Sequence, residues 1–360
     1  MRTTSRSVLT QVAIADYRDS FVRLLTETEP GLQIQVGECY FEASVRTSAA
    51  VRVSPATRTV RNHFFAGRRL CWQSLNWRAV FGSDVLVGEL NPRILSTWVA
   101  LAVRRLLGKR SVLWGHAWAR SGPDSRTEPV RHLMRRMANG LLLYTHQQRA
   151  ELVDRYPDLG PSCFVAPNSL YLESDMSPFE NLPAPSDFIY VGRLVKSKKV
   201  ELLIRAFSLF SAKTPLSTLH LVGDGEESEA LRDLASSLGC NAIFHGHVSD
   251  RSRLRELYSR SVSSVSPGYV GLSITQSFSF GVPMIISRDE PHSPEIEAFK
   301  DGMNGSFFST DDAEDLRLKM THWYDQRAIL GSLSPSIVEH CKRTYSVERM
   351  VEGFREAMGA

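Results

Sequence analysis

Short apolar runs alternate with longer amphipathic segments along most of the chain. Strands that alternate with helices at this spacing favour a parallel sheet with helices on both faces. The stretch 58–72 follows neither period and has no predicted structure. In the first half the pattern predicts strands at 7–15, 32–37, 84–90, 111–116, 141–145 and 163–167, and helices at 19–26, 94–107, 128–138 and 147–156.

The alternation is clearer in the second half, where helical segments of about ten residues separate the strands. Strands are predicted at 188–193, 218–223, 242–246, 262–266, 283–287 and 305–309. Between the halves, 169–186 loses its periodicity and contains three prolines, which is typical of a linker. Apolar residues recur at helical spacing in 347–358, so this last segment should dock one apolar face on a domain.

A chain of 360 residues exceeds what one hydrophobic core usually organises. We therefore predict an α/β protein with two Rossmann-like domains that face each other across a cleft. The predicted boundaries are an acceptor-side domain at 1–170, a linker at 171–186, a donor-binding domain at 187–345 and a docking helix at 346–360. Ligands of such sheets bind beyond the carboxyl ends of the strands, so the cleft is the expected site.

Composition places the chain among ordinary globular proteins, with 42% hydrophobic and 23% charged residues. Its five cysteines are scattered and form no Cys-x-x-Cys pair, which argues for a reducing compartment and against a disulfide framework or a zinc site. Polar residues interrupt the apolar run near the N-terminus, so no signal peptide is predicted. The longest apolar segment, 94–107, is too short to span a bilayer and is read as a largely buried helix. A cytoplasmic protein is expected.

Charge is unevenly spread along the chain. Residues 1–175 carry a net charge of +8 and residues 176–360 a net charge of −4. The basic region is compatible with anionic lipid head groups or with a pyrophosphate-bearing acceptor, although solvated helix faces explain such runs equally well. We therefore consider an anionic membrane surface as a partner, with the protein peripheral on the inner face of the membrane, and expect no nucleic-acid partner. The region contains Arg104, Arg105, Lys109, Arg110, Arg120, Arg126, Arg131, Arg135 and Arg136.

The stretch 266–283, SPGYVGLSITQSFSFGVP, reads as a strand end, a tight loop and a helix that starts near Leu272 or Ser273. Gly268 and Gly271 precede that helix start. Unpaired backbone N–H groups and the positive end of the helix dipole at such a place suit a phosphate. The alternative is an ordinary glycine-containing turn between strand and helix.

A second loop carries cations at the end of a predicted strand. In 188–199, FIYVGRLVKSKK, the strand delivers Gly192 and Arg193 to a loop, and Lys198 follows near a helix start. An arginine and a lysine there can hold a diphosphate and stabilise its charge as it leaves. Surface cations at a loop are the alternative. The run LVGDGE ends the next strand at Gly223, but Ser228 stands where a dinucleotide fingerprint needs its third glycine, so NAD binding is not predicted.

In order, GRLVKSKK, LVGDGE, FHGHV, SPGYVGLSITQSFSFGVP and DGMNGSFF resemble the carboxyl-terminal domain of glycosyltransferase family 4, the retaining enzymes of the GT-B fold. The resemblance covers about 185–330 well. It extends more loosely to the first half through GELNPRILSTW, SVLWGHAW, LLLYTHQQ and FVAPNS, which look like the acceptor domain of polysaccharide and lipopolysaccharide members.

The resemblance implies roles for individual residues. Arg193 and Lys198 match the cations that bind the donor diphosphate, and His116 matches the histidine that faces the donor sugar. Gly271 and Leu272 match the loop whose amides meet the distal phosphate. The family usually carries two glutamates in this stretch, one near the sugar and one on the ribose, but this chain has Gly268 and Gln276 there. The expected donor-binding set is Gly192, Gly223, Gly268, Gly271, Leu272, Ser273, Gln276 and Glu295.

Two acids are candidates to replace the missing glutamate near the sugar. Glu295 is expected at the start of a helix that Ser293 caps and Pro294 opens, and Glu89 ends a predicted strand. Gln276 can still bind a ribose hydroxyl through its carbonyl oxygen. No metal or other cofactor is expected, because the acids of the run TDDAED fit the first turn of a helix that Thr310 caps.

The resemblance implies a hexosyltransferase that moves a sugar with retention from a nucleotide diphosphate sugar to a glycan or a lipid-linked acceptor. In the mechanism proposed for such enzymes, the leaving diphosphate accepts the acceptor's proton, and the protein supplies positioning and charge stabilisation. Two alternatives stay open. One is a catalytically weak homologue that acts as a binding subunit, since the glutamate pair is absent. The other is a nucleotide-sugar 2-epimerase on the same architecture.

Overall fold

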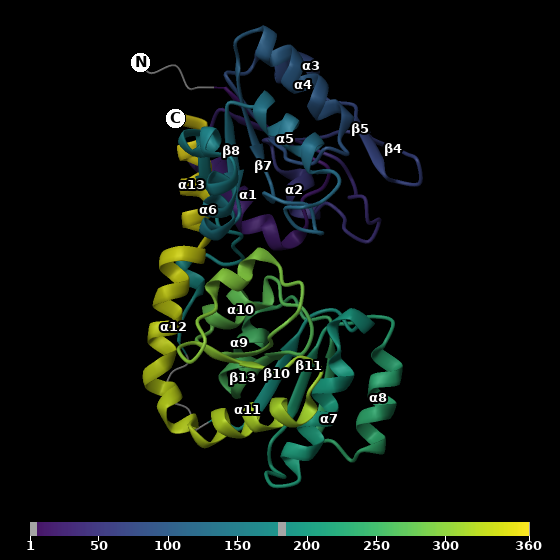
Figure 1. Ribbon diagram of the computed structural model, residues 1–360, viewed down its shortest axis with the longest axis vertical. Coiled ribbons are helices and arrows are strands. Elements are labelled where there is room, and N and C mark those ends of the chain that lie inside the picture. Colours follow the sequence, from purple (N-terminus) through teal and green to yellow (C-terminus); the bar gives the residue numbers. More distant parts are fainter. Residues whose placement is uncertain (1–5, 179–184, 360) are drawn as a thin grey trace. The chain divides into compact units, whose positions relative to one another are not determined.

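The computed structural model describes residues 6–178 and 185–359, and the chain divides into two compact units (Figure 1). Unit 1 comprises Met1–Leu170 together with Ser346–Ala360, and unit 2 comprises Tyr171–Tyr345. Part of the predicted linker, residues 179–184, lies outside the described residues. Each unit contains its own parallel sheet, which confirms the predicted α/β class with two Rossmann-like domains.

The sheet of unit 1 has the strand order β3-β2-β1-β6-β7-β8-β9, and every neighbouring pair is parallel. The order reverses between β1 and β6, so the carboxyl ends of these two strands flank the topological switch point, where α/β sheets usually bind ligands. The strands are β1 (Ser7–Gln11), β2 (Leu32–Val36), β3 (Thr57–Thr59), β6 (Val85–Glu89), β7 (Arg110–Trp114), β8 (Gly140–Leu143) and β9 (Cys163–Val165).

Helices cover the sheet of unit 1, and the last helix of the chain is one of them. Helix α13 packs on α1, β8 and β9. Its Phe354 ring lies 4.8 Å from the ring of Phe21 and 4.7 Å from that of Trp114. Gly353 faces the Val165 carbonyl so closely that a Cβ atom would collide with it. The helices are α1 (Asp19–Thr28), α2 (Ala49–Val53), α3 (Trp77–Gly82), α4 (Leu95–Leu106), α5 (Glu128–Met137), α6 (His146–Arg155) and α13 (Val347–Gly359).

The stretch 58–72, for which no structure was predicted, contains most of an antiparallel hairpin. Strands β4 (Asn62–Phe65) and β5 (Leu70–Gln73) pair across a turn in which Ala66, Gly67 and Arg68 all have positive φ. Two of those three residues are not glycine, so the turn lacks the usual glycine signal. The short helices α2 and α3 were likewise not predicted, because five or six residues are too few to establish a helical period.

Helix α4 is amphipathic, which corrects the prediction of a largely buried helix. Residues Leu95, Val99 and Leu106 are exposed on it, although Arg104 is completely buried. The Arg104 guanidinium donates to the carbonyls of Ser83 and Asp84 and to the Ser111 hydroxyl. It therefore joins α4 to the loop before β6 and to β7, and it is not available to a membrane or an acceptor.

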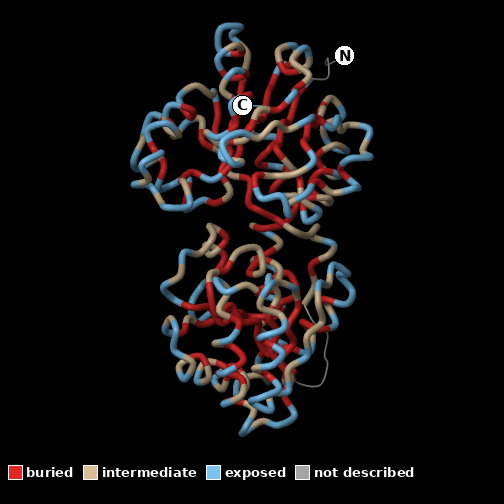
Figure 2. Tube along the Cα trace, turned by 90° about the vertical axis from the view of Figure 1, so that its right-hand side faces the viewer, coloured by how far each residue is buried: buried red, intermediate tan, exposed pale blue. Residues whose placement is uncertain are grey.

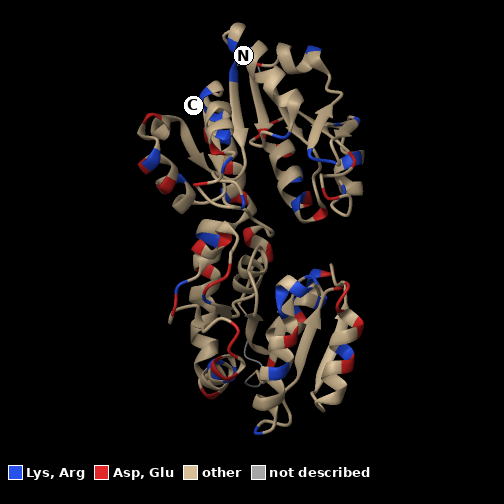
Figure 3. Cartoon of the chain, turned by 45° about the vertical axis from the view of Figure 1, so that its right-hand side comes forward, with Lys and Arg blue, Asp and Glu red and all other residues tan. Residues whose placement is uncertain are grey.

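Arg135 on α5 is a second member of the predicted basic region that the structure buries. It is 1% exposed, and its guanidinium forms two hydrogen bonds with the Glu128 carboxylate, at 2.8 and 3.0 Å. Other members, among them Arg105, Arg126 and Arg136, are exposed. Figure 3 shows the charged residues mainly on helices and loops of each unit, with few on the strands.

The sheet of unit 2 has the order β12-β11-β10-β13-β14-β15, again with all pairs parallel. Its order reverses between β10 and β13, so the loops that follow these two strands meet at the switch point. The strands are β10 (Asp187–Val191), β11 (Leu219–Val222), β12 (Ala242–Gly246), β13 (Ser261–Ser266), β14 (Met284–Ser287) and β15 (Gly305–Phe308), each within four residues of its predicted bounds.

Helices α7 and α11 pack together against the sheet of unit 2 around a core of Phe, Leu and Ile side chains. In each unit the buried residues lie mainly toward the inside and the exposed residues along the outer loops and helices (Figure 2). Helix α11 is capped by Asp312, whose side chain accepts from the backbone of Glu314 and Asp315, so the predicted cap by Thr310 is wrong. The helices are α7 (Val200–Ser211), α8 (Ser228–Ser237), α9 (Arg251–Ser259), α10 (Ser273–Ser279), α11 (Ala313–Asp325) and α12 (Leu330–Tyr345).

No helix within the described ranges is long and apolar enough to cross a membrane. The five cysteines are all free thiols, as their scattered positions predicted. Burial raises the pKa of the Cys163 thiol to about 11, so this thiol is not reactive at neutral pH.

Candidate active site

The loops after β10 and β13 bring the predicted cations and the predicted glycine loop of unit 2 together. Arg193, two residues beyond β10, is exposed, and its guanidinium lies 3.4 Å from the hydroxyl oxygen of Tyr269. Lys198, at the end of the short helix η4 (Lys196–Lys198), donates from Nζ to the Tyr269 carbonyl at 2.8 Å. The same Nζ lies 3.4 Å from the centre of the Tyr269 ring. Tyr269 therefore links the two cations to the loop that follows β13.

Close backbone contacts explain three glycines of this site. A Cβ atom on Gly268 would lie 2.6 Å from the Ser197 carbonyl oxygen, below any ordinary contact distance. Gly223 has a φ of +133°, and a Cβ on it would collide with the Gly192 carbonyl. A Cβ on Gly192 would lie 2.8 Å from the hydroxyl oxygen of Tyr190. These glycines let the loops after β10, β11 and β13 pack against one another at one edge of the sheet.

The glycine loop leads into helix α10 as predicted. Leu272 occupies the N-cap position and Ser273 is the first residue of the helix. Within the described residues, the backbone N–H groups of Gly271 and Leu272 make no hydrogen bond, as is usual for the start of a helix. These two donors are available to a ligand.

His292 holds the other side of this loop. Its Nδ1 accepts from the Val270 N–H at 3.1 Å, and its Nε2 lies 2.9 Å from the Ser287 carbonyl, to which it must donate. A ring that accepts at one nitrogen and donates at the other is neutral. Burial lowers the pKa of His292, which keeps the ring in this form. His292 thereby fixes the loop to the end of β14.

Gln276 and Glu295, the remaining predicted donor-binding residues, are both engaged with the protein. Gln276 donates to the Tyr171 hydroxyl at 2.9 Å and accepts from that of Tyr258 at 3.4 Å. Glu295 is 3% exposed and lies in a five-residue 3-10 helix, η5 (Pro294–Ala298). Ser293 occupies the N-cap position of η5, but its side chain makes no capping hydrogen bond, which corrects that prediction.

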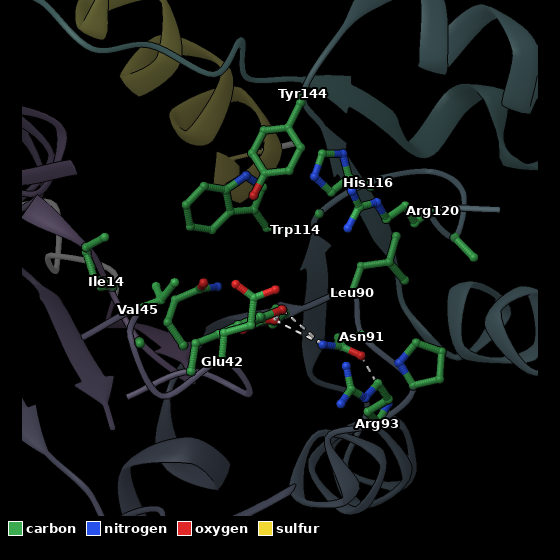
Figure 4. A pocket seen from close by; sticks show the side chains of 18 of the residues that line it. Ile14, Glu42, Val45, Leu90, Asn91, Arg93, Trp114, His116, Arg120 and Tyr144 are labelled. Atoms are coloured by element: carbon green, nitrogen blue, oxygen red, sulfur yellow. Dashed lines mark hydrogen bonds between the residues drawn. The ribbon is translucent and has the colours of Figure 1, made fainter. Parts of the chain in front are cut away.

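A pocket of about 630 Å³ opens at the switch point of the sheet in unit 1 (Figure 4). Its walls come from the segments that follow β1, β6, β7 and β8, so the fold itself explains why residues far apart in sequence meet there. In Figure 4, His116, Arg120 and Tyr144 gather on one side, while Glu42 and Val45 lie on another. Other lining residues are Gln11, Arg18, Tyr40, Glu89, Asn91, Arg93, Trp114 and Arg131.

His116, the predicted sugar-facing histidine, lines this pocket two residues after β7. Its side chain is open to the pocket and otherwise surrounded by protein. This surrounding, with the positive charges of Arg131 and Arg18, lowers the pKa of His116 to about 4. The imidazole is therefore neutral at physiological pH and can hydrogen-bond a sugar without carrying charge.

Glu89 ends β6 inside the pocket and has three donors around its carboxylate. The Tyr40 hydroxyl donates to it at 2.9 Å, the Val12 N–H at 3.3 Å and the Asn91 amide at 3.3 Å. Burial raises the pKa of Glu89, and these hydrogen bonds only partly oppose that effect. A carboxyl group held in this way is suited to bind a sugar hydroxyl.

Sequence reasoning named the cations, the glycines and His116, but missed three tyrosines and an arginine around them. Tyr269, Arg18, Tyr40 and Tyr144 were not among the predicted site residues. Tyr269, Arg18 and Tyr40 each lie three residues beyond a predicted strand, and Tyr144 lies near the end of one, so position alone could have drawn attention to them. No motif marks Arg18 or Tyr40. No group of three or more His, Cys, Asp and Glu side chains gathers as a metal site in the part of the chain that the structure describes.

Residues 176–336 match the protein-family model described as glycosyl transferases group 1. Among curated proteins, the chain is 27% identical over 157 residues to mannosylfructose-phosphate synthase of Agrobacterium fabrum, covering 40% of this chain and 34% of that protein. It is 33% identical over 138 residues to the lipopolysaccharide core biosynthesis glycosyltransferase LpsE of Rhizobium meliloti, covering 37% and 38%. The chain thus spans about a third of the length of the curated relatives that it matches.

Solved structures resemble the whole chain in fold. The Anabaena protein HepE, in complex with UDP, superposes with a TM-score of 0.74 at 13% identity and covers 99% of both chains. Sucrose-phosphate synthase from Thermosynechococcus elongatus superposes with a TM-score of 0.68 at 17% identity and covers 98% of both. The chain therefore has the GT-B fold of these proteins, and residues 176–336 of unit 2 are similar to the group 1 glycosyl transferases.

Proposed function

We propose that this protein is a retaining hexosyltransferase that uses a nucleoside diphosphate sugar and extends a glycan or a lipid-linked acceptor. One observation carries the proposal: Arg193, Lys198 and the loop from Gly268 to Leu272 converge at the switch point of the sheet in unit 2. That edge is where a doubly wound sheet binds nucleotides. The matched family and the UDP held by HepE support the same chemistry.

The two cations suit a diphosphate that becomes a leaving group. Charge on the diphosphate increases as its bond to the sugar breaks, and fixed positive charges stabilise that change most. Arg193 provides a fork of donors and Lys198 a compact charge that the Tyr269 carbonyl positions. The amides of Gly271 and Leu272 supply further donors without needing a side chain.

The proposed reaction needs little acid–base chemistry from the protein. The acceptor oxygen bonds to the anomeric carbon, the bond from that carbon to the diphosphate breaks, and the diphosphate takes the acceptor's proton. The retaining outcome rests on the family resemblance, and anomeric NMR of the product tests it. Because two side-chain cations face the diphosphate position, we propose that no metal is needed, and activity should persist in EDTA.

Other residues would position the nucleotide. Gly192 and Gly223 let the loops after β10 and β11 pack closely at this edge of the sheet, which shapes the place proposed for the nucleotide. Gln276 is held between Tyr171 and Tyr258, and its carbonyl oxygen has a second lone pair for a ribose hydroxyl. Glu295 is buried beside this loop, so we assign it a supporting role in donor binding.

Calorimetric titration of the full chain with UDP, GDP and ADP tests the donor site. Arg193→Ala and Lys198→Ala should each weaken binding of the preferred nucleotide about tenfold, which corresponds to one charge-assisted hydrogen bond. Lys196→Ala is the matched control, because Lys196 is an exposed lysine on the same short helix η4. If no nucleotide binds to folded protein, or if all three variants weaken binding equally, the proposal is wrong.

A further inference from the structure

Arginines dominate the charged side chains that line the pocket of unit 1. Four arginines and two glutamates line it, together with the exposed ring of Tyr17 and the half-buried ring of Tyr144. At about 630 Å³ the pocket is of the size that usually holds a small ligand. The charged residues are Arg18, Arg93, Arg120, Arg131, Glu42 and Glu89.

Three of these arginines have only uncharged partners. Arg131 donates to the Leu90 carbonyl at 3.0 Å, Arg93 donates to the Arg69 carbonyl at 2.8 Å, and Arg18 lies 4.7 Å from the centre of the Trp114 ring. Within the described residues, none of the three is within 4 Å of a carboxylate oxygen. Buried and half-buried charges are normally paired, so Arg18, which is buried, and Arg131, which is half-buried, lack the partner that such sites require, whereas Arg93 is exposed.

A neighbour on the same helix shows what pairing looks like in this protein. Arg135 lies one helical turn after Arg131 on α5, and it forms a two-pronged ion pair with Glu128. Glu128 thus pairs directly with the arginine that faces the core, whereas it acts on Arg131, which faces the pocket, only from beyond 4 Å. The Nε atoms of both arginines are buried without a hydrogen-bond partner, so the two differ in the ion pair alone.

The pocket's two glutamates offset the charge of its four arginines only in part, and Glu89 acts mainly on Arg93. Glu89 has three donors of its own, and burial raises its pKa. Glu42 is exposed and, in Figure 4, lies across the pocket from Arg120 and His116. Burial lowers the pKa of His116, and the positive charges of Arg131 and Arg18 lower it further.

We propose that this pocket holds a sugar acceptor by an anionic group, a carboxylate or a phosphate ester, which Arg131, Arg120 and Arg18 bind beside His116. The ring of Tyr17 gives the sugar an apolar surface, and Glu89 with Tyr40 gives it hydrogen-bonding groups. This inference rests on the proposed function, since it names the acceptor class of the same enzyme.

The test measures binding of four probes to the full chain saturated with UDP. Trigalacturonate and glucose 6-phosphate are the anionic probes, and galactotriose and glucose are their neutral counterparts. At least one anionic probe should bind about tenfold more tightly than its counterpart, and raising the salt concentration should weaken that binding. The stronger of the two anionic probes identifies whether the group is a carboxylate or a phosphate.

Arg120→Gln and Arg131→Gln should each weaken the anionic probe about fivefold or more and leave the neutral probes and UDP unchanged. Arg58→Gln is the control, because it removes an exposed charge from β3 of the same unit, outside the pocket. Arg120 is exposed, so its replacement should not disturb folding even if that of Arg131 does.

The outcomes separate this inference from the proposed function. If UDP binds and the neutral probes bind as tightly as the anionic probes or more tightly, the acceptor is not anionic and the proposed glycosyltransferase stands. If the anionic probes bind but UDP does not, the proposed transferase is wrong and the anion-binding pocket stands. If no sugar probe binds, the inference is wrong. It is also wrong if the protein binds only phosphatidylglycerol vesicles and the arginine variants abolish that binding.

Discussion

Replacement of Gly268 by alanine should damage the donor site, although the change adds a single methyl group. The added Cβ would lie 2.6 Å from the Ser197 carbonyl oxygen and 3.0 Å from two backbone atoms of Lys198. Backbone atoms cannot rotate away as the end of a side chain can. The helix η4 would therefore have to move by about half an ångström, and it carries Lys198 with it.

The expected cost follows from this geometry. Overpacking a filled site by a methyl group costs about 1–3 kcal/mol, and the lower entropy of the unfolded alanine chain offsets at most about 1 kcal/mol. Gly268 does not have a positive φ, so backbone strain adds nothing. A net loss of about 1–2 kcal/mol lowers the melting temperature of a unit of this size by about 2–8 °C. The shift of Lys198 should weaken UDP binding about tenfold.

Calorimetric unfolding and UDP titration of Gly268→Ala measure both effects. Gly331→Ala is the matched control in the same unit, because nothing lies within 4 Å of its Cβ position and it is in helix α12. That control should stabilise the protein by up to about 1 kcal/mol and leave UDP binding unchanged. If Gly268→Ala melts as high as Gly331→Ala and binds UDP normally, the close packing of these loops is not essential.

Two further predictions concern unit 1. The folded-state pKa of His116 is depressed to about 4, so its contribution to stability is complete above pH 6.5 and is lost as the pH falls toward 4. The melting temperature of His116→Gln should therefore decline less than that of the wild type between pH 6.5 and pH 4. If the two melting temperatures fall in parallel, the pKa of His116 is not lowered by folding. Helix α4 exposes Leu106 (88%) beside Arg105, so Leu106→Ser should reduce the amount of protein that sediments with phosphatidylglycerol vesicles. The control Leu216→Ser removes an equally exposed leucine (89%) from unit 2 and should sediment as the wild type does. Equal sedimentation of the two variants would argue against a membrane surface on α4.

Much of the fold could be predicted because strands buried on both faces leave strong signals. Strand β13 (SVSSVS) shows how far this goes, since it is mostly serine and is still buried throughout. Its serines hydrogen-bond to the Pro283 carbonyl and to the Ser277 hydroxyl, contacts that no local pattern reveals. What could not be predicted was either short, such as α2, or lacked a recognisable turn signal, such as the hairpin of β4 and β5.

The basic region shows why composition alone could not define a site. Arg104, Arg131 and Arg135 look alike in the sequence, but one ties helix α4 to neighbouring loops, one lines the pocket and one pairs with Glu128. Their roles depend on which direction each helix face points after packing. Only the folded chain separates structural arginines from those that can meet a ligand.

The glycine at 268 also explains how the site can lack a glutamate that the family resemblance leads one to expect. With no side chain there, the loop after β13 approaches the backbone of η4 closely enough for the Tyr269 carbonyl and ring to hold Lys198. A glutamate at this position would need the space that the Ser197 carbonyl occupies. The same contact that removes an acid from the sugar side therefore fixes a cation on the diphosphate side. In a reaction where stabilising the leaving group is the main task, such an exchange is compatible with catalysis.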